Sequence, residues 1–233
     1  MHMTGTTNDS VRAEWVQRKL TSLSSGLRIL DAGAGEQRFK PYCKHLEYVS
    51  QDFGEYDPQA SKTGLHPDQW DHGKLDIVSD ITAIPQADAS FDAILCTEVL
   101  EHVPDALAAL NEFHRLLNPG GRLLLTVPFV SFTHFAPYHF STGFSRYYFE
   151  LHLKNLGFKI DEIYLNGNFF ELLAQEVRRA RDVADKYTDR RLSFFDKRAL
   201  KMVINLLGKL GDSDRGSSEL ACYGVFVEAT RGD

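Results

Sequence analysis

The sequence predicts an α/β fold built on a doubly wound, mostly parallel sheet. Short apolar runs alternate with helical or polar stretches that suit crossover connections. The first run ends in Asp31-Ala32-Gly33-Ala34-Gly35, a turn whose glycines let the backbone approach a ligand closely. A helix predicted over residues 105–117 is stopped by Asn118-Pro119-Gly120-Gly121, immediately before another apolar run. This alternation is typical of parallel sheets, whose neighbouring strands need a helical crossover.

The remaining elements follow from the spacing of apolar residues. An amphipathic helix is predicted over residues 11–23, with Trp15, Leu20 and Leu23 near one face. Strands are predicted at residues 27–30, 48–49, 75–78, 91–96 and 123–127. Helices follow at 145–157, 168–186 and 196–210, and strands at 158–165 and 222–229. Ser145 is the candidate N-cap of the first of these helices.

Length and charge limit the classes of protein that this chain represents. Its 233 residues suffice for one substantial core and are short for two, so we expect a single domain, 1–233. The net charge of -6 argues against a nucleic-acid partner, because such binding depends on clustered Lys and Arg. Residues 1–10 lack the pattern of a signal peptide, and no stretch reaches the ~18 apolar residues of a membrane span. We therefore expect a soluble, cytoplasmic protein without stable membrane insertion.

The cysteines indicate neither a disulfide framework nor a zinc site. Cys43, Cys96 and Cys222 lie far apart and form no CxxC pair. We assign no metal site from the sequence.

Residues 168–210 form a predicted helical insertion before the last strand. Three roles suit it: a lid, a cap that binds the acceptor, or the contact of a homodimer. Its second helix carries many apolar residues together with lysines and one arginine, a composition that also suits a membrane surface. Because such a helix usually packs against its own domain, we expect that arrangement here.

Carboxylates follow three successive predicted strands. Asp31 directly precedes the glycine turn, Asp52 closes the second strand and Asp80 follows the third. In a doubly wound sheet, ligands bind at the carboxyl ends of the strands, so these acids should line one crevice. Asp52 is placed to accept from ribose hydroxyls. The carboxylate of Asp80 and the backbone N–H of Ile81 are placed to bind the two polar edges of an adenine.

Several motifs together resemble a known family. They are Asp31-Ala32-Gly33-Ala34-Gly35, Asp80-Ile81, residues 90–103 (SFDAILCTEVLEHV) and Leu117-Asn118-Pro119-Gly120-Gly121. In type and order they are similar to the motifs of the methyltransferase type 11 family, over residues 27–165. The resemblance implies a class I S-adenosylmethionine-dependent methyltransferase with a seven-stranded sheet and an antiparallel last strand.

The resemblance also implies a binding mode for S-adenosylmethionine, above the first, second and fourth strands. Gly33 and Gly35 then adjoin the methionyl group, and the backbone of Cys96 its amino-acid end. Asp52 contacts the ribose, and Asp80 with Ile81 the adenine.

The same turn argues against a nicotinamide-dependent oxidoreductase, which is one alternative. Gly35-Glu36-Gln37-Arg38 has Arg38 where both the dinucleotide fingerprint and the methyltransferase turn usually have a third glycine. Asp31 suits the ammonium of a methionyl group and would repel a pyrophosphate. A second alternative is a non-catalytic module that binds S-adenosylmethionine and serves as a scaffold or sensor.

The acceptor side is indicated by side chains that can take a proton. The sulfonium methyl is already activated, so positioning can suffice, but a hydroxyl acceptor also benefits from a base. The candidate catalytic residues are Glu98, His134 and His139, and His139 is the preferred base. Glu101-His102 is better explained as a cap or orienting pair for the following helix.

The leading hypothesis is methyl transfer to a small-molecule hydroxyl, that of a sugar or related metabolite. Residues 133–140 and the helix over 146–155 resemble a subgroup of type 11 enzymes associated with the modification of sugars or cell-surface glycans. Those enzymes commonly have an acid at the position of His139. An amine or carboxylate acceptor is the remaining alternative.

Overall fold

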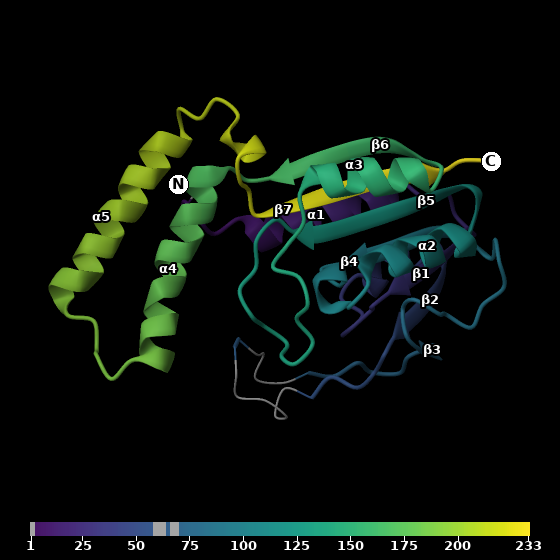
Figure 1. The fold of residues 1–233 in the computed structure, drawn as a ribbon, viewed down its shortest axis with the longest axis horizontal. Helices are drawn as coiled ribbons and strands as arrows, with labels where there is room; N and C mark the ends of the chain where they lie inside the picture. The colour runs from purple at the N-terminus through teal and green to yellow at the C-terminus, as the bar shows by residue number, and fades with distance from the viewer. Residues whose placement is uncertain (1–2, 58–63, 66–69) are drawn as a thin grey trace. The chain divides into compact units, whose positions relative to one another are not determined.

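The parallel strands meet in one seven-stranded sheet of order β3-β2-β1-β4-β5-β7-β6 (Figure 1). The structure is a computed structural model that describes residues 3–57, 64–65 and 70–233. The strands are β1 (Arg28–Ala32), β2 (Glu47–Asp52), β3 (Ile77–Val78), β4 (Phe91–Thr97), β5 (Leu117–Pro128), β6 (Phe158–Asn166) and β7 (Gly224–Arg231). β1 pairs in parallel with β2 and β4, β2 with β3, and β4 with β5. In Figure 1, β5 and β6 point away from the C-terminus whereas β7 leads to it, so the sheet is mixed, as predicted.

The central strands are covered on both faces, which explains their nearly continuous apolar sequence. In β4 every residue from Ala93 to Cys96 is fully buried. Asp92 and Thr97 are polar and partly buried, and the carboxylate of Asp92 accepts from the backbone N–H of Arg28 (2.9 Å) and the side-chain amide of Asn118 (2.8 Å). This polar side chain therefore joins β4 to both of its neighbours.

Helices lie on both faces of the sheet. Figure 1 shows α2 (Ala106–Leu116) and α3 (Arg146–Asn155) in front of the strands and α1 (Asn8–Thr21) behind them. Asp105 caps α2, since its carboxylate accepts from the backbone N–H of Ala108 at 2.9 Å. Ser145 occupies the predicted N-cap position of α3, but its hydroxyl makes no capping hydrogen bond.

Most strand boundaries differ from the prediction by a few residues, and β5 and β3 differ for reasons that the structure shows. Asn118-Pro119-Gly120-Gly121 lies within β5 rather than before it, because the pairing shifts between Phe91–Leu117 and Ala93–Arg122 and the extra residues bulge from the strand. β3 comprises only two residues, Ile77–Val78. Next to β3, the carboxylate of Asp76 accepts from the N–H and the hydroxyl of Ser50, at 2.9 and 2.8 Å. These side-chain hydrogen bonds stand where a longer strand would form backbone hydrogen bonds.

The chain divides into two compact units. One comprises residues 14–164 and 225–233 and contains the glycine turn with its neighbouring strand ends. The other comprises residues 165–224 and the amino-terminal segment up to Ala13. Within the second unit, the N–H of Gly5 and the hydroxyl of Tyr223 both donate to the carboxylate of Glu171, each at 2.7 Å. These bonds join the amino-terminal segment to the first helix of the unit.

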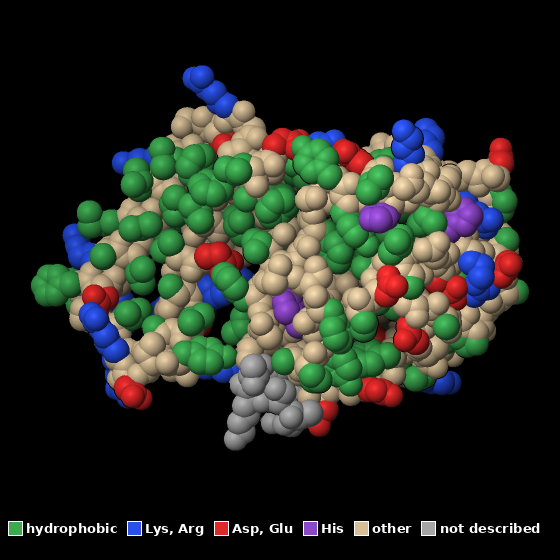
Figure 2. All heavy atoms as spheres, viewed as in Figure 1, with side chains coloured by type: hydrophobic (Ala, Val, Ile, Leu, Met, Phe, Trp, Pro, Cys, Tyr) green, Lys and Arg blue, Asp and Glu red, His purple; other side chains and the backbone are tan. Residues whose placement is uncertain are grey.

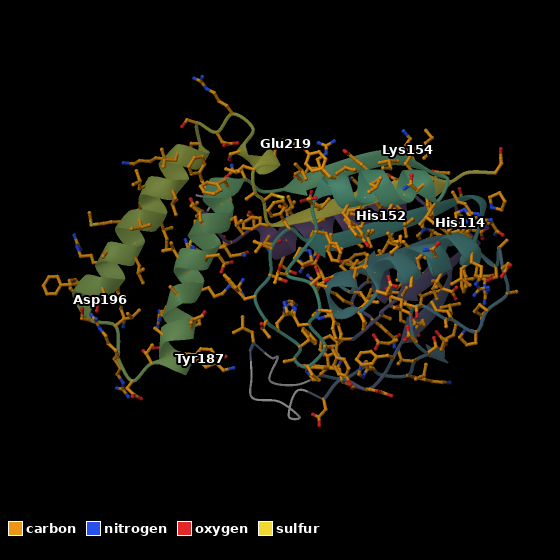
Figure 3. The ribbon with its side chains drawn as sticks, in the orientation of Figure 1. His114, His152, Lys154, Tyr187, Asp196 and Glu219 are labelled. Atoms are coloured by element: carbon orange, nitrogen blue, oxygen red, sulfur yellow. The ribbon has the colours of Figure 1, made fainter. Side chains whose placement is uncertain are left out.

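Two helices dominate the second unit, α4 (Phe169–Tyr187) and α5 (Phe194–Gly211). Tyr187, at the end of α4, and Asp196, in a capping box with Ser193 at the start of α5, lie on either side of their connection (Figure 3). A short 3-10 helix, η3 (Ser217–Glu219), follows.

The apolar side of α5 does not pack as expected. Leu207 is its one buried residue, whereas Met202 and Leu206 are 68% and 56% exposed. Figure 2 shows hydrophobic side chains at the surface over this pair of helices.

None of the helices in the described part of the chain combines the length and apolar character required to cross a membrane.

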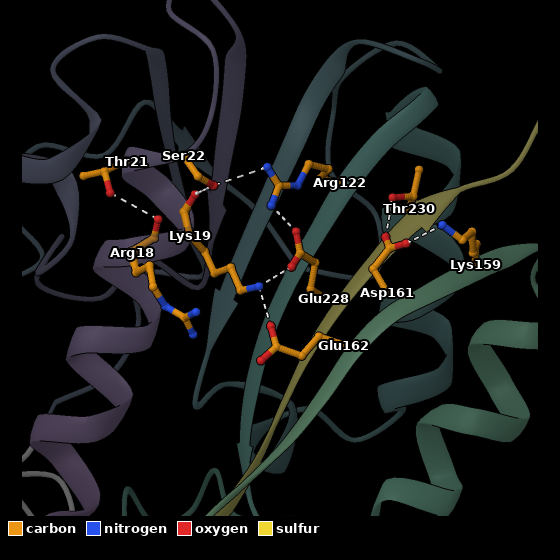
Figure 4. A network of polar contacts seen from close by, with 10 residues as sticks. All are labelled: Arg18, Lys19, Thr21, Ser22, Arg122, Lys159, Asp161, Glu162, Glu228 and Thr230. Atoms are coloured by element: carbon orange, nitrogen blue, oxygen red, sulfur yellow. Dashed lines mark hydrogen bonds and ion pairs between the residues drawn. The ribbon is translucent and has the colours of Figure 1, made fainter.

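An ionic network joins α1 to the far half of the sheet (Figure 4). The ammonium of Lys19 pairs with Glu162 of β6 and Glu228 of β7, and Arg122 of β5 also pairs with Glu228. Burial raises the pKa of the Glu228 carboxyl, but its hydrogen bonds with Lys19 and Arg122 outweigh this and hold the pKa below its usual value. Glu228 therefore stays ionised and links a helix to three strands.

We expect Glu228→Ala to destabilise the protein by on the order of 3 kcal/mol, because it leaves two partly buried cations without their shared anion. The measurement is urea-induced unfolding followed by circular dichroism. Lys159→Ala is the matched control, since this lysine pairs with Asp161 on the same sheet but is 80% exposed. Equal unfolding midpoints for the two variants would contradict a structural role for the network.

Candidate functional site

The turn after β1 adopts a backbone that favours glycine. Gly33 and Gly35 have φ angles of +72° and +49°. A Cβ added at Gly33 would lie 2.5 Å from a methyl carbon of Val99, so a larger residue does not fit. The N–H groups of Gly33 and Ala34 donate to the carbonyl of Gln51, at 2.9 and 2.8 Å. The turn is thereby held against the carboxyl end of β2.

Asp52 lies at this turn, as predicted, and also supports it. Its side chain is buried, and its Oδ2 accepts from the N–H of Gly35 at 2.9 Å while its Oδ1 accepts from the N–H of Gly54 at 3.0 Å. The neighbouring Gln51 accepts from the N–H of Gly33 at 3.3 Å and donates to the carbonyl of Ser79 at 2.7 Å. The sequence does not indicate Gln51, because one polar residue inside a short strand produces no periodic pattern of apolar residues.

Asp31 is a buried acid with one strong hydrogen bond. It is 2% exposed, and the hydroxyl of Tyr48 donates to its Oδ2 at 2.6 Å. Burial raises the pKa of the Asp31 carboxyl to about 6; the bond from Tyr48 lowers it in part, and the charge of Asp52 raises it further. Asp31 therefore changes charge just below neutral pH.

Asp80 and Ile81 follow β3 at the same edge of the sheet. Their strand is in register with β2, where Val78 pairs with Asp52. Asp80 is exposed, and its Oδ1 accepts from the N–H and hydroxyl of Thr82, at 2.8 and 2.7 Å. Ile81 is buried. The pair follows the strand next to Asp52, as the sequence predicted.

Cys96 lies near the end of β4, one residue past the paired stretch that joins Asp31 to Leu95. Burial raises the pKa of its thiol well above the usual range, and the charges of Glu101, Asp31 and Glu98 raise it further. The thiol is thus protonated and unreactive. The shift also shows that three carboxylates surround this strand end.

Strained backbone conformations gather around the same edge. Among the described residues, Gln37, Glu98 and Phe135 are three of the four non-glycine residues with positive φ, at 55°, 54° and 53°. Such conformations are costly and concentrate at functional sites. Glu98 is held by Thr126, whose carbonyl accepts its N–H at 2.8 Å and whose hydroxyl donates to its carboxylate at 3.0 Å.

An aromatic cluster lies beside the glycine turn. The rings of Tyr56, Trp70 and Phe135 have centroids 4.5 to 5.6 Å apart. A Cβ added at Gly35 would come within 2.9 Å of the Trp70 ring. The sequence analysis missed Tyr56 and Trp70, because they belong to an irregular segment without apolar periodicity.

Three histidines come together next to this cluster. The ring centroids of His102 and His134 are 4.6 Å apart, those of His134 and His139 are 5.0 Å apart, and those of His102 and His139 are 6.0 Å apart. Burial lowers the pKa of His102 to about 4 and also lowers that of His139. Both rings are therefore neutral at pH 7. The sequence indicates Glu98, His134 and His139 as candidate bases and favours a capping or orienting role for Glu101-His102.

Comparisons with known proteins agree with this geometry. A family model described as "Methyltransferase domain" matches residues 8–208. A "Ubiquinone biosynthesis O-methyltransferase" of Xanthomonas oryzae pv. oryzae is 34% identical over 119 residues, which are 50% of this chain and 48% of that protein. A protein of the same name from Xylella fastidiosa is 29% identical over 123 residues, 50% of this chain and 47% of that one. The chain spans about half the length of the curated relatives it matches.

Solved structures share the fold at low identity. An "S-adenosylmethionine dependent methyltransferase" from Mesorhizobium loti superposes with a TM-score of 0.55 at 16% identity, over 96% of this chain and all of that one. A "Phospholethanolamine N-methyltransferase 2" of Haemonchus contortus, solved with S-adenosylhomocysteine, gives 0.53 at 16% identity, over 96% of this chain and 53% of that one. The cyclase SpnF gives 0.54 at 16% identity, over 95% of this chain and 80% of that one.

The mixed sheet of order 3214576, the glycine turn at its centre and the family match over residues 8–208 lead to one conclusion. This chain belongs to the methyltransferase domain family, whose members are class I, S-adenosylmethionine-dependent enzymes.

Proposed function

We propose that this protein transfers the methyl group of S-adenosylmethionine to a hydroxyl of a small molecule. The observation that carries the proposal is the set of groups at the carboxyl ends of β1, β2 and β4. They combine the glycine turn, in which Gly33 and Gly35 have positive φ angles, with the carboxylates of Asp31, Asp52 and Glu98. Negative charge in this position favours a donor that carries an ammonium and a sulfonium.

In the proposed binding mode, Gly33 and Gly35 adjoin the methionyl group, and the backbone of Cys96 and the carboxylate of Asp31 its amino-acid end. Asp52 accepts from the ribose through lone pairs that its bonds to Gly35 and Gly54 leave available. Asp80 and Ile81 bind the adenine. The residues present fit the donor, since the buried carboxylate of Asp31 can pair with a cation and carboxylates accept from hydroxyl and amino groups.

The reaction needs one bond to form and one to break. The acceptor oxygen attacks the methyl carbon, and the carbon–sulfur bond breaks to leave neutral S-adenosylhomocysteine. The hydroxyl proton passes to His139, a neutral ring next to His134, while Glu98 and His134 are the other candidate bases. The aromatic rings of the cluster exclude water from this side.

The acceptor class is supported by the curated relatives, whose name specifies O-methyl transfer. The resemblance of residues 133–140 to type 11 enzymes extends the proposal to a sugar or related metabolite, for which the aromatic side chains offer stacking surfaces. An amine or carboxylate acceptor is the alternative. A non-catalytic module that binds S-adenosylmethionine is a second alternative. The family match argues against a third, a nicotinamide-dependent oxidoreductase.

The acceptor atom is tested directly with S-adenosylmethionine labelled in the methyl group. The protein is incubated with a sugar, a catechol, an amine and a carboxylic acid, and the products are analysed by mass spectrometry and NMR. A labelled O-methyl product is expected. Label found exclusively on nitrogen or on a carboxylate would overturn the hydroxyl assignment.

We expect Asp80→Ala and Asp52→Ala each to weaken S-adenosylmethionine binding by about tenfold or more, since a hydrogen bond to a charged group contributes about 1–3 kcal/mol. Isothermal titration calorimetry measures the affinity. Asp88→Ala is the control, because Asp88 is exposed and pairs with Arg115. If both site variants bind the donor as wild type does, the assignment of these two residues is wrong.

The affinity for the donor should fall in acid. The ionised form of Asp31 attracts the methionyl ammonium, and protonation removes that charge as the pH falls through about 6. The dissociation constant should then rise by about tenfold per pH unit below this value. In Asp31→Asn this dependence should disappear. Calorimetry between pH 4.5 and 7.5 measures the dissociation constant of the donor for wild type and for Asp31→Asn. The same pH dependence in both proteins would refute the role of Asp31.

We expect His139→Ala to lower kcat by about 10²–10⁴-fold, the usual contribution of a positioned base, while donor affinity stays unchanged. Initial rates and calorimetry measure the two quantities. His152→Ala, on α3, is the control and should keep full turnover. Turnover of His139→Ala at the level of this control would exclude His139 as the base.

A further inference from the structure

The three histidines next to the donor crevice form a cluster with the dimensions of a metal site. Their ring nitrogens include one atom from each of His102, His134 and His139 that all lie within 4.8 Å of one another. Two segments supply them: His102 ends the 3-10 helix η2 (Leu100–His102), and the other two belong to the loop after β5. His134 and His139 are close in sequence, whereas His102 lies far upstream, so the sequence does not indicate that the three histidines meet.

Hydrogen bonds fasten these two segments together. The N–H groups of Phe140 and Ser141 donate to the carbonyl of Glu101, at 2.9 and 3.1 Å. The Nδ1 of His102 donates to the carbonyl of Tyr138 at 2.5 Å. The loop that carries His134 and His139 is thus bound to the turn that carries His102, which presents the three rings together.

The hydrogen bonds also set which ring nitrogen carries the proton. A carbonyl oxygen only accepts, so the Nδ1 atoms of His102 and His134 must donate, the latter to the carbonyl of Phe132 at 2.9 Å. The lone pair of each ring then lies on Nε2. Metal-ligating histidines commonly donate their other ring N–H to a backbone carbonyl in this way. Neither ring nitrogen of His139 has a hydrogen-bond partner among the described residues, although both are buried.

We propose that His102, His134 and His139 bind one divalent transition-metal ion, with Zn²⁺ as the best fit. Imidazole nitrogens suit zinc and its neighbours, whereas Mg²⁺ and Ca²⁺ prefer oxygen ligands. With zinc–nitrogen bonds of about 2.0–2.1 Å, nitrogens at tetrahedral angles lie about 3.4 Å apart. The nitrogens lie within 4.8 Å of one another, so the rings must move closer together to bind the ion. Three protein ligands leave the fourth position of a tetrahedral ion open.

The surroundings favour a cation. The Oε1 of the buried Glu101 lies 3.7 Å from the Nε2 of His102 and adds negative charge beside the ligands. Phe135 contacts both His102 and Trp70, with ring centroids 5.1 and 5.0 Å apart, and Trp70 adjoins Gly35. The rings of Phe135 and Trp70 therefore connect the histidine cluster to the glycine turn.

An ion at this position would bind the acceptor oxygen and ease the loss of its proton, as zinc does for water. This role rests on the proposed function, but binding of the ion does not. With zinc bound, the lone pair of His139 is directed to the metal, so His139 acts as the base in the metal-free protein alone.

The experiment measures metal binding without any turnover. The full, untagged chain is stripped of metals with a chelator and titrated with Zn²⁺ in a calorimeter. We expect one Zn²⁺ per chain, and a loss of affinity of about tenfold or more in His102→Ala and in His139→Ala. His114→Ala is the matched control, because His114 lies in the last turn of α2, at the opposite end of the sheet, and contacts Phe158. Mg²⁺ serves as the oxygen-preferring comparison and should not compete.

Co²⁺ gives a second readout, since a tetrahedral site with nitrogen ligands produces intense visible absorption. These bands should appear in wild type and in His114→Ala and should be absent in His102→Ala. Binding of S-adenosylhomocysteine, measured on the same samples, shows that each variant is folded. Absence of saturable zinc binding, or equal zinc affinity in all variants, overturns the metal site. That result leaves the proposed methyl transfer intact if the nucleoside still binds.

Discussion

The parallel pairing of β1 with β2 on one side and β4 on the other is the constraint on which the rest of the site depends. Ala32 lies opposite Gln51, and Asp31 lies opposite Leu95, so the three strands end together at one edge. The glycine turn, Asp52 and Cys96 meet there for that reason alone. A shift of one residue in either register would turn the side chains of the shifted strand to the other face of the sheet. The groups of the site would then no longer lie together.

Several carboxylates lie close together at this edge, where burial makes their ionised forms unfavourable. Asp31 is almost fully buried and lies near Asp52, and Glu98 and Glu101 lie with Asp31 near Cys96. The bond from Tyr48 and the backbone N–H groups that reach Asp52 compensate part of the cost. In the proposed binding mode, a cationic donor offsets the remainder. The same negative charge favours a cation beside the neighbouring histidines.

The fold supports several reactions, as its likeness to both methyltransferases and a cyclase shows. Specificity must therefore come from the segments that the sheet carries rather than from the sheet itself. In this chain the decisive segment is the loop after β5, which is fastened to Glu101 and brings Phe135, His134 and His139 over the strand ends. The groups proposed to bind the donor come from the strand ends, and those proposed to contact the acceptor come from this loop.

Local patterns in the sequence determined most strands and helices and the position of the glycine turn. Apolar runs predict β1 and β4, and Asp105 predicts the start of α2. The glycines of the turn adopt positive φ angles, which glycine tolerates in any surroundings. These features depend on residues close together in the chain, so they are visible without a structure. Asp52 and Asp80 could be placed because the ends of parallel strands share one edge.

The tertiary structure alone decided the bulge in β5, the shortness of β3, the exposure of the apolar side of α5 and the aromatic and histidine clusters. Each depends on contacts between segments that are distant in sequence or irregular in backbone, for which neither a period of two nor one of 3.6 residues gives a signal. His102 illustrates the difference. Its neighbours in sequence suggest a helix cap, whereas its neighbours in space are two further histidines.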